Sequence, residues 1–211
     1  MKETMKVTEA IAQLKIQDDR IGKALSDLKV VAANRISAQK VDGMTADEFK
    51  KLATSSYTSA TTLINRYNAM KEAINEFNAS TKVNIGGREM SVASALYMKT
   101  WGINQKKGLL DILTKQLTVA ETKMQRENGE KLDDAAERHA KQSFEGDMKT
   151  DKIKYLEFIE EYKSRNQFTI VDPLNIRKLI EELTDEIAKF ETSVDTAIQI
   201  ANATHDITIE Y

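Results

Sequence analysis

The sequence contains no cysteine, a single proline and only eight glycines in 211 residues, and 6% of its residues are aromatic. An average protein has about 5% proline and 7% glycine, so this chain offers few positions for turns. A β-sandwich or β-barrel needs a turn signal about every 8–12 residues, and a disulfide scaffold needs cysteine. Both classes are excluded, and we predict a mainly α fold made of long helices.

The chain also lacks an excess of charge of one sign and a long apolar run. Its 31 basic and 33 acidic residues give a formal charge of -2, so no net field attracts nucleic acid, and we expect no nucleic-acid partner. Nowhere do about 18 apolar residues follow one another, so we expect no membrane span. The first residues, 1–6, enter an amphipathic pattern without the apolar core of a signal peptide. These features predict a cytoplasmic protein.

Apolar residues near the N-terminus recur in steps of four and three, which is typical of a coiled-coil helix. The series is Val7, Ile11, Leu14, Ile21, Leu25 and Leu28, and it predicts a first helix over about residues 3–40, before Asp42-Gly43. Asp18 occupies the position between Leu14 and Ile21. It has two interpretations. It is either a polar residue that sets the register by pairing with a lysine or arginine of a facing helix, or a residue that contacts a ligand or partner.

The middle of the chain contains clear start and stop signals. Thr45 followed by Glu48 forms a capping box, which predicts a second helix with a seam that extends to Phe77. Residues 83–90 alternate around Gly86-Gly87, a pattern that predicts a tight hairpin. Ser91 then caps a third helix, which runs up to Asn128-Gly129.

Residues 126–167 are rich in charges of both signs, a composition typical of a solvated segment, and we interpret them as an insertion. Within it we predict helices over residues 130–142 and 151–166. Residues 168–171 have the composition of a strand, Asp172-Pro173 signals a helix start, and residues 207–211 alternate like a strand. We therefore predict one domain, 1–211: a long-helix antiparallel bundle or coiled coil with one small sheet at one end, made of the hairpin, 168–171 and 207–211.

The sequence assembles no recognisable catalytic or metal site. His139 and His205 are its only histidines, and neither has the spacing of a nucleophile system or of a zinc site. We expect no cofactor, no metal and no enzymatic activity. Gly86-Gly87-Arg88 lacks the spacing of a phosphate-binding loop. Arg88 nevertheless lies close to the helix start at Ser91, where free N–H groups attract anions, and is a candidate binding residue.

A second set of candidates is rich in side-chain amides. Its members are Asn65, Arg66 and Asn68 on the second helix and Asp195, Gln199 and Asn202 on the last. Asn65 and Asn68, like Gln199 and Asn202, are three residues apart and share a helix face. Asparagine is a poor residue for a helix interior. The set is interpreted either as an interhelical hydrogen-bond network or as a polar pocket for a small ligand or a partner's backbone.

At these residues the sequence resembles the septicolysin-like family, a bacterial and phage group of small helical proteins with a domain of unknown function. The resemblance rests on Ile64-Asn65-Arg66-Tyr67-Asn68, on Gly87-Arg88 leading into 91–96, and on Asp172 and Leu179 opening a helix that ends in Asp195, Ile198, Gln199 and Asn202. It covers about residues 5–125 and 168–211. It implies a helical bundle with a small sheet and no established enzymatic activity.

Three functions are compatible with the sequence. The first is a non-enzymatic interaction protein that forms homo-oligomers through its helix seams and, as a prophage product, acts on a host protein. The second is a protein that binds or sequesters a nucleotide or other metabolite through Asn65, Arg66, Asn68, Gln199 and Asn202. The third is a membrane-active toxin.

Overall fold

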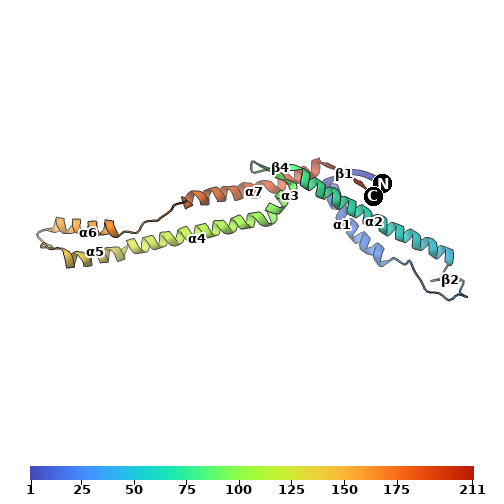
Figure 1. Cartoon of the computed structure of the whole chain (residues 1–211), viewed down its shortest axis with the longest axis horizontal. Coiled ribbons are helices and arrows are strands. Elements are labelled where there is room, and N and C mark those ends of the chain that lie inside the picture. Colours follow the sequence, from blue (N-terminus) through green and yellow to red (C-terminus); the bar gives the residue numbers. More distant parts are fainter. The chain divides into compact units, whose positions relative to one another are not determined.

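The computed structural model describes residues 1–211 and confirms the mainly α fold class (Figure 1). The chain contains seven α-helices, one π-helical turn and six short strands. The helices are α1 (Val7–Ser26), α2 (Ala46–Ser80), α3 (Val92–Tyr97), α4 (Ile103–Asn128), α5 (Glu130–Ser143), α6 (Lys152–Asn166) and α7 (Ile176–Thr204), with the π-helical turn at Met98–Gly102. The strands are β1 (Lys2–Lys6), β2 (Lys40–Val41), β3 (Met44–Thr45), β4 (Lys82–Ile85), β5 (Arg88–Ser91) and β6 (Asp206–Glu210). No helix is both long enough and apolar enough to span a membrane.

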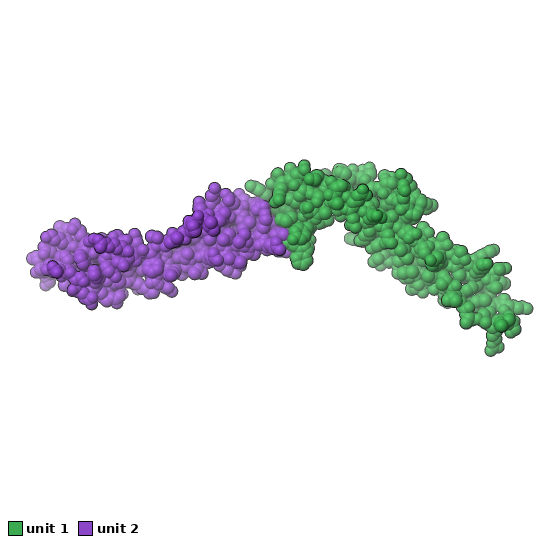
Figure 2. Space-filling view, in the orientation of Figure 1, with its two compact units in different colours: residues 1–101, 189–211 green, residues 102–188 purple.

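The chain forms two compact units, coloured separately in Figure 2. Unit 1 consists of residues 1–101 and 189–211, and unit 2 consists of residues 102–188. One boundary falls at the end of the π-helical turn and the other within α7. The sequence predicts one domain with an insertion, and whether the units fold as one domain stays a prediction.

In unit 1 the two ends of the chain pair with each other (Figure 1). Strands β1 and β6 are antiparallel, with Met5 opposite Ile207 and Glu3 opposite Ile209. Their inward residues Met5, Ile207 and Ile209 are buried, and α2 packs against β6. The predicted C-terminal strand is confirmed, and the alternation of residue types that predicts it corresponds to alternately exposed and buried positions in β6.

The first helix is shorter than predicted at both ends. Residues 2–6 are not helical because they form β1, whose partner lies about 200 residues later in the chain. At the other end α1 stops at Ser26. Beyond it Val30, Val31 and Ile36 are exposed. Since helices in proteins are stabilised mainly by packing of an apolar face, the unpacked segment after Ser26 does not continue the helix.

The predicted caps and turns are confirmed. The Thr45 hydroxyl accepts a hydrogen bond from the Glu48 N–H at 3.3 Å, and the Glu48 carboxylate accepts one from the Thr45 N–H at 2.8 Å. Gly86 and Gly87 have φ values of 59° and 87°, the left-handed conformation that a two-residue hairpin requires. Ser91 caps α3 by accepting a hydrogen bond from the Ser94 N–H at 3.1 Å.

The prediction of one small sheet is wrong, because the structure contains three separate two-stranded sheets: β1 with β6, β2 with β3, and β4 with β5. Residues 168–171 form no strand. The backbone of Phe168 instead forms hydrogen bonds with a side chain. The Asn128 side chain accepts from the Phe168 N–H at 2.7 Å and donates to the Phe168 carbonyl at 2.8 Å. A strand needs a neighbour, and β6 already pairs with β1.

In unit 2, α4 lies beside the first half of α7 in an antiparallel arrangement (Figure 1). Ion pairs join Lys106 to Glu186 and Glu121 to Arg177. Helix α7 begins at Ile176, later than Asp172-Pro173 suggests, because Pro173 lies in a turn. Asp172 still caps the helix, since its carboxylate accepts a hydrogen bond from the Ile176 N–H at 2.8 Å.

The two helices predicted within the charged insertion are confirmed as α5 and α6, and they pack against each other as a hairpin with a small core of their own. Ala136, Ala140 and Ile159 are buried in it. The ring of His139 stacks on Phe158 with ring centroids 5.4 Å apart. The small alanines let the two helices approach closely, so this hairpin packs around few side chains.

We expect that this hairpin can be removed without disturbing unit 1. The hydrogen bonds between Asn128 and Phe168 show that the two ends of the hairpin are close together. A deletion of residues 130–166, bridged by a short glycine-serine linker, should leave hydrogen exchange of the β1 and β6 amides unchanged, because that sheet belongs to unit 1. Faster exchange of those amides in the deletion variant would contradict this independence.

Candidate functional site: a polar network centred on Arg66

Arg66 is the predicted site residue around which a polar site is built. It lies on α2 and its side chain is partly buried. Its guanidinium donates to the Glu3 carboxylate from Nε at 3.2 Å and from Nη2 at 2.8 Å. It also donates from Nη2 to Gln13 Oε1 at 2.6 Å and from Nη1 to Gln17 Oε1 at 3.1 Å. This one side chain therefore connects β1, α1 and α2.

Glu3 and Tyr211 complete the network where the chain termini meet. The Tyr211 hydroxyl donates to Glu3 Oε1 at 2.6 Å, and the Arg66 guanidinium carbon lies 5.9 Å from the centre of the Tyr211 ring. Hydrogen bonds from Arg66, and then from Tyr211, lower the pKa of Glu3 below its usual value. The same bond to the Glu3 carboxylate raises the pKa of Tyr211.

Gln13 and Gln17 hold the other side of the guanidinium. Gln17 is only 3% exposed and is the one buried polar residue of the core. A guanidinium has donors but no acceptor, so both amides must turn their oxygen toward Arg66 and their NH2 group elsewhere. The orientation of each amide is thus determined by Arg66.

A cavity of 290 Å³ opens beside this network. It is lined by Gln13, Ile16, Gln17 and Arg20 from α1 and by Arg66 from α2. The four α1 residues are spaced by three, one and three positions, which places them on one face of the helix. The cavity therefore lies between the two long helices of unit 1.

The remaining amide candidates do not join Arg66. Asn65, Asn68 and Gln199 are exposed. Asn202 is half-buried, and its side-chain oxygen is buried without a hydrogen-bond partner. None of the cavities described here is lined by more than one of the five residues assigned to a ligand pocket. Consecutive helix positions differ by about 100°, so Arg66 points at α1 while its asparagine neighbours face solvent.

Three further candidates lie elsewhere in unit 1. Arg88 is exposed on β5, and Asp195 is exposed and pairs with Lys99 at 2.5 Å. Asp18 is exposed on α1, so the assignment of Asp18 as the seam residue is wrong. The buried face of α1 repeats as Val7, Ala10, Leu14 and Gln17, and Gln17 is its polar member. Whether any of these exposed residues binds a partner stays a prediction.

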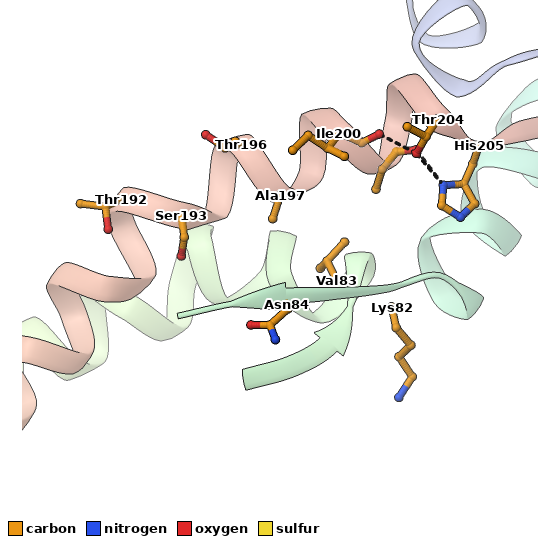
Figure 3. A pocket seen from close by; sticks show the side chains of 11 residues that line it. Lys82, Val83, Asn84, Thr192, Ser193, Thr196, Ala197, Ile200, Thr204 and His205 are labelled. Atoms are coloured by element: carbon orange, nitrogen blue, oxygen red, sulfur yellow. Dashed lines mark hydrogen bonds between the residues drawn. The ribbon is translucent and has the colours of Figure 1, made fainter. Parts of the chain in front are cut away.

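A second cavity, of 540 Å³, runs between β4 and α7 (Figure 3). Val83 and Asn84 line its strand side, and Ser193, Ala197 and Ile200 belong to its helix side. The hydroxyls along this part of α7 mostly bond within the helix, as Ser193 Oγ does to the Lys189 carbonyl at 2.6 Å. The groove is therefore shallow, is lined by both polar and apolar side chains, and presents few polar groups that are free to bind a ligand.

No group of three or more His, Cys, Asp or Glu side chains is arranged to hold a metal ion. Both histidines contact aromatic rings: His139 lies against Phe158 and Tyr162, and the His205 ring lies 5.4 Å from that of Phe77. The structure thus gives both histidines packing contacts.

Sequence reasoning missed Glu3, Gln13, Gln17, Arg20 and Tyr211. Three of them could have been found from the sequence. Gln13, Gln17 and Arg20 are spaced by four and three residues, on the face of α1 that includes Leu14. Glu3 and Tyr211 were not, since they reach the site only through the pairing of β1 with β6.

Comparison with known proteins does not identify the chain. No family model matches it, and no curated protein matches it. A solved structure with some similarity is the crystal structure of a functionally unknown conserved protein from Corynebacterium diphtheriae, which is 19% identical. The alignment covers 97% of this chain and 99% of that one, with a TM-score of 0.38. The septicolysin-like resemblance stays a prediction.

Proposed function

We propose that this chain is a non-enzymatic helical interaction protein that forms homo-oligomers through the exposed face of α4. The observation that carries the proposal is a second apolar stripe on that helix. Leu109, Ile112 and Val119 are 50%, 52% and 67% exposed. The proposal keeps two predictions from the sequence, a cytoplasmic location and a protein partner of the host cell.

The two stripes of α4 differ in what covers them. The first, Leu110, Leu113 and Leu117, is half-buried on the side that α7 occupies. The second stripe precedes the first by one position along the chain and so lies about 100° around the helix. One packed neighbour covers an apolar stripe about 100° wide, and here the second stripe stays exposed beside the one that faces α7. The missing neighbour of α4 is, in this proposal, α4 of a second copy.

The residues around the second stripe extend the apolar surface. Val171 and Leu174 are exposed apolar residues that line a cavity of 260 Å³. Gln116, which lies between Ile112 and Val119 on the same face of α4, lines this cavity too. The stripe and this cavity together provide a surface that a helix of a second copy would cover.

We expect the double variant Ile112→Glu, Val119→Glu to be monomeric. Both side chains are exposed, so the fold should change in stability by only about 0.5 kcal/mol, whereas two carboxylates in a desolvated contact should abolish association. Light scattering at micromolar concentration should give a multiple of 23.8 kDa for the natural sequence and a single chain for the variant. The control Ile36→Glu, at a fully exposed position of unit 1, should keep the oligomer mass. A single-chain mass for the natural sequence would refute the proposal.

The second predicted function, metabolite binding, keeps only Arg66 of its five residues. Asn65, Asn68 and Gln199 face solvent, and Asn202 lines none of the described cavities. Support for a small ligand comes instead from the cavity beside Arg66.

A further inference from the structure

The cavity beside Arg66 is lined by hydrogen-bond donors and has no carboxylate in its lining. Its five residues are Gln13, Ile16, Gln17, Arg20 and Arg66. Glu3 contacts Arg66 from the β1 side but does not line the cavity. The α2 segment from Phe49 to Lys71, which supplies Arg66, contains no acidic residue at all.

The donors of the network can be counted atom by atom. Arg66 has five N–H groups, and four of them are used: Nε and one Nη2 hydrogen on Glu3, the other Nη2 hydrogen on Gln13, and one Nη1 hydrogen on Gln17. One Nη1 hydrogen remains. Because both glutamine oxygens are committed to Arg66, each amide contributes only its NH2 group to other partners.

Arg20 adds a positive charge that nothing in the structure balances. Its guanidinium makes no ion pair, although Asp18 and Asp19 are close in sequence. Those two carboxylates lie about 200° and 100° away around the helix, so they project from other faces of α1. Glu3 compensates Arg66, and the charge of Arg20 is left over at the cavity.

We propose that this cavity binds a small metabolite through an oxyanion, either a carboxylate or a phosphate. Arg20 supplies the charge, and Gln13, Gln17 and the remaining Arg66 N–H supply fixed donors. Ile16 offers an apolar wall for the carbon part of the ligand. At 290 Å³ the cavity is just below the range of typical ligand pockets, about 300–1,000 Å³, so the ligand is small. The site belongs to unit 1 and is independent of self-association through α4 in unit 2.

The burial of Gln17 favours binding over a purely structural role for the donors. The side chain is only 3% exposed, yet its NH2 group is not among the buried polar atoms that lack a partner, so this donor stays accessible to an acceptor that enters the cavity. Fixed donors in a partly desolvated site bind an anion more strongly than the same groups in water, because they need no reorganisation.

The test uses the full chain labelled with ¹⁵N and follows the side-chain NH2 signals of Gln13 and Gln17. Sodium phosphate and sodium butyrate are the two probes, titrated separately, and sodium chloride at the same ionic strength is the reference. We expect saturable shifts of both amide signals with at least one probe. Saturation with phosphate alone identifies a phosphate ligand, with butyrate alone a carboxylate ligand, and with both a general oxyanion site. Shifts no larger than those in chloride for either probe would overturn the proposal.

The variant Arg20→Gln separates a specific site from general charge attraction. Arg20 is exposed and unpaired, so its replacement leaves the fold intact, but it should weaken binding about tenfold to hundredfold, the effect of one charge-assisted hydrogen bond. Arg35→Gln removes the same charge from an exposed loop of unit 1 and should change binding less than twofold. Equal weakening in the two variants would overturn the proposal.

Discussion

Replacement of Arg66 by methionine is expected to lower the free energy of unfolding by about 2–3 kcal/mol. The change leaves Glu3 without its charged partner and leaves the oxygen of Gln17, on a side chain that is nearly fully buried, without a donor. Breaking a fully buried ion pair costs about 3–5 kcal/mol. The value here is lower because the Glu3 side chain is about one third exposed.

The measurement is urea unfolding followed by circular dichroism. Arg20→Met is the matched control. Arg20 lines the same cavity but has no ion-pair partner, so its replacement should change the free energy of unfolding by no more than about 0.5 kcal/mol. Arg66→Lys should lie between the two, because an ammonium keeps the charge but cannot contact Glu3, Gln13 and Gln17 at once. Similar stabilities of the Arg66→Met and Arg20→Met variants would show that the network does not stabilise the fold.

The Arg66 variant should also respond differently to acid. The bonds from Arg66, and then from Tyr211, lower the pKa of Glu3 below its usual 4.5. A lowered pKa in the folded state gives stability that is present above pH 4.5 and is lost as the pH falls through the folded value. Other carboxylates with a lowered pKa, such as Glu127 and Asp147, act equally in both proteins. The stability difference between the natural sequence and Arg66→Met should therefore shrink as the pH falls below 4.5, and a constant difference would exclude Glu3 as its source.

The features that the sequence predicts correctly are those written within a few neighbouring residues. The cap at Thr45, the hairpin at Gly86-Gly87 and the cap at Ser91 each depend on side chains or backbone angles within one turn. The wrong predictions concern partners distant in the chain. Residues 2–6 could be assigned to a strand only by knowing that residues 206–210 lie beside them, and residues 168–171 lack such a neighbour.

The site shows the same limit. Arg66 was singled out because asparagines surround it in the sequence, yet Asn65 and Asn68 are exposed and take no part in its network. What makes Arg66 special is the face it shares with the buried residues of α2, since Met70 and Ile74 follow it at spacings of four and eight. A polar residue in a buried stripe is the stronger signal, and the same rule applied to α1 selects Gln17 in place of Asp18.

Replacement of Met70 by alanine is expected to lower the free energy of unfolding by about 2–5 kcal/mol. Met70 is the largest of the fully buried side chains. Its truncation removes apolar contacts and leaves a cavity in unit 1. Met70→Leu keeps most of the volume and should cost less than about 1.5 kcal/mol. Tyr57→Ala, at an exposed position of the same helix, should change little. Urea unfolding of the three variants checks this order, and an Ala variant as stable as the Leu variant would contradict it.

A double variant tests whether this core and the Arg66 network are one structural unit. Met70 lies one helical turn after Arg66 on the same face of α2, so a cavity at position 70 lets the helix shift and loosens the contacts of Arg66 with Glu3 and Gln17. The loss in the double variant Arg66→Met, Met70→Ala should then be smaller than the sum of the single losses by at least about 0.5 kcal/mol. Strict additivity would mean that the core does not position Arg66, and that α1 and β1 alone hold its guanidinium in place.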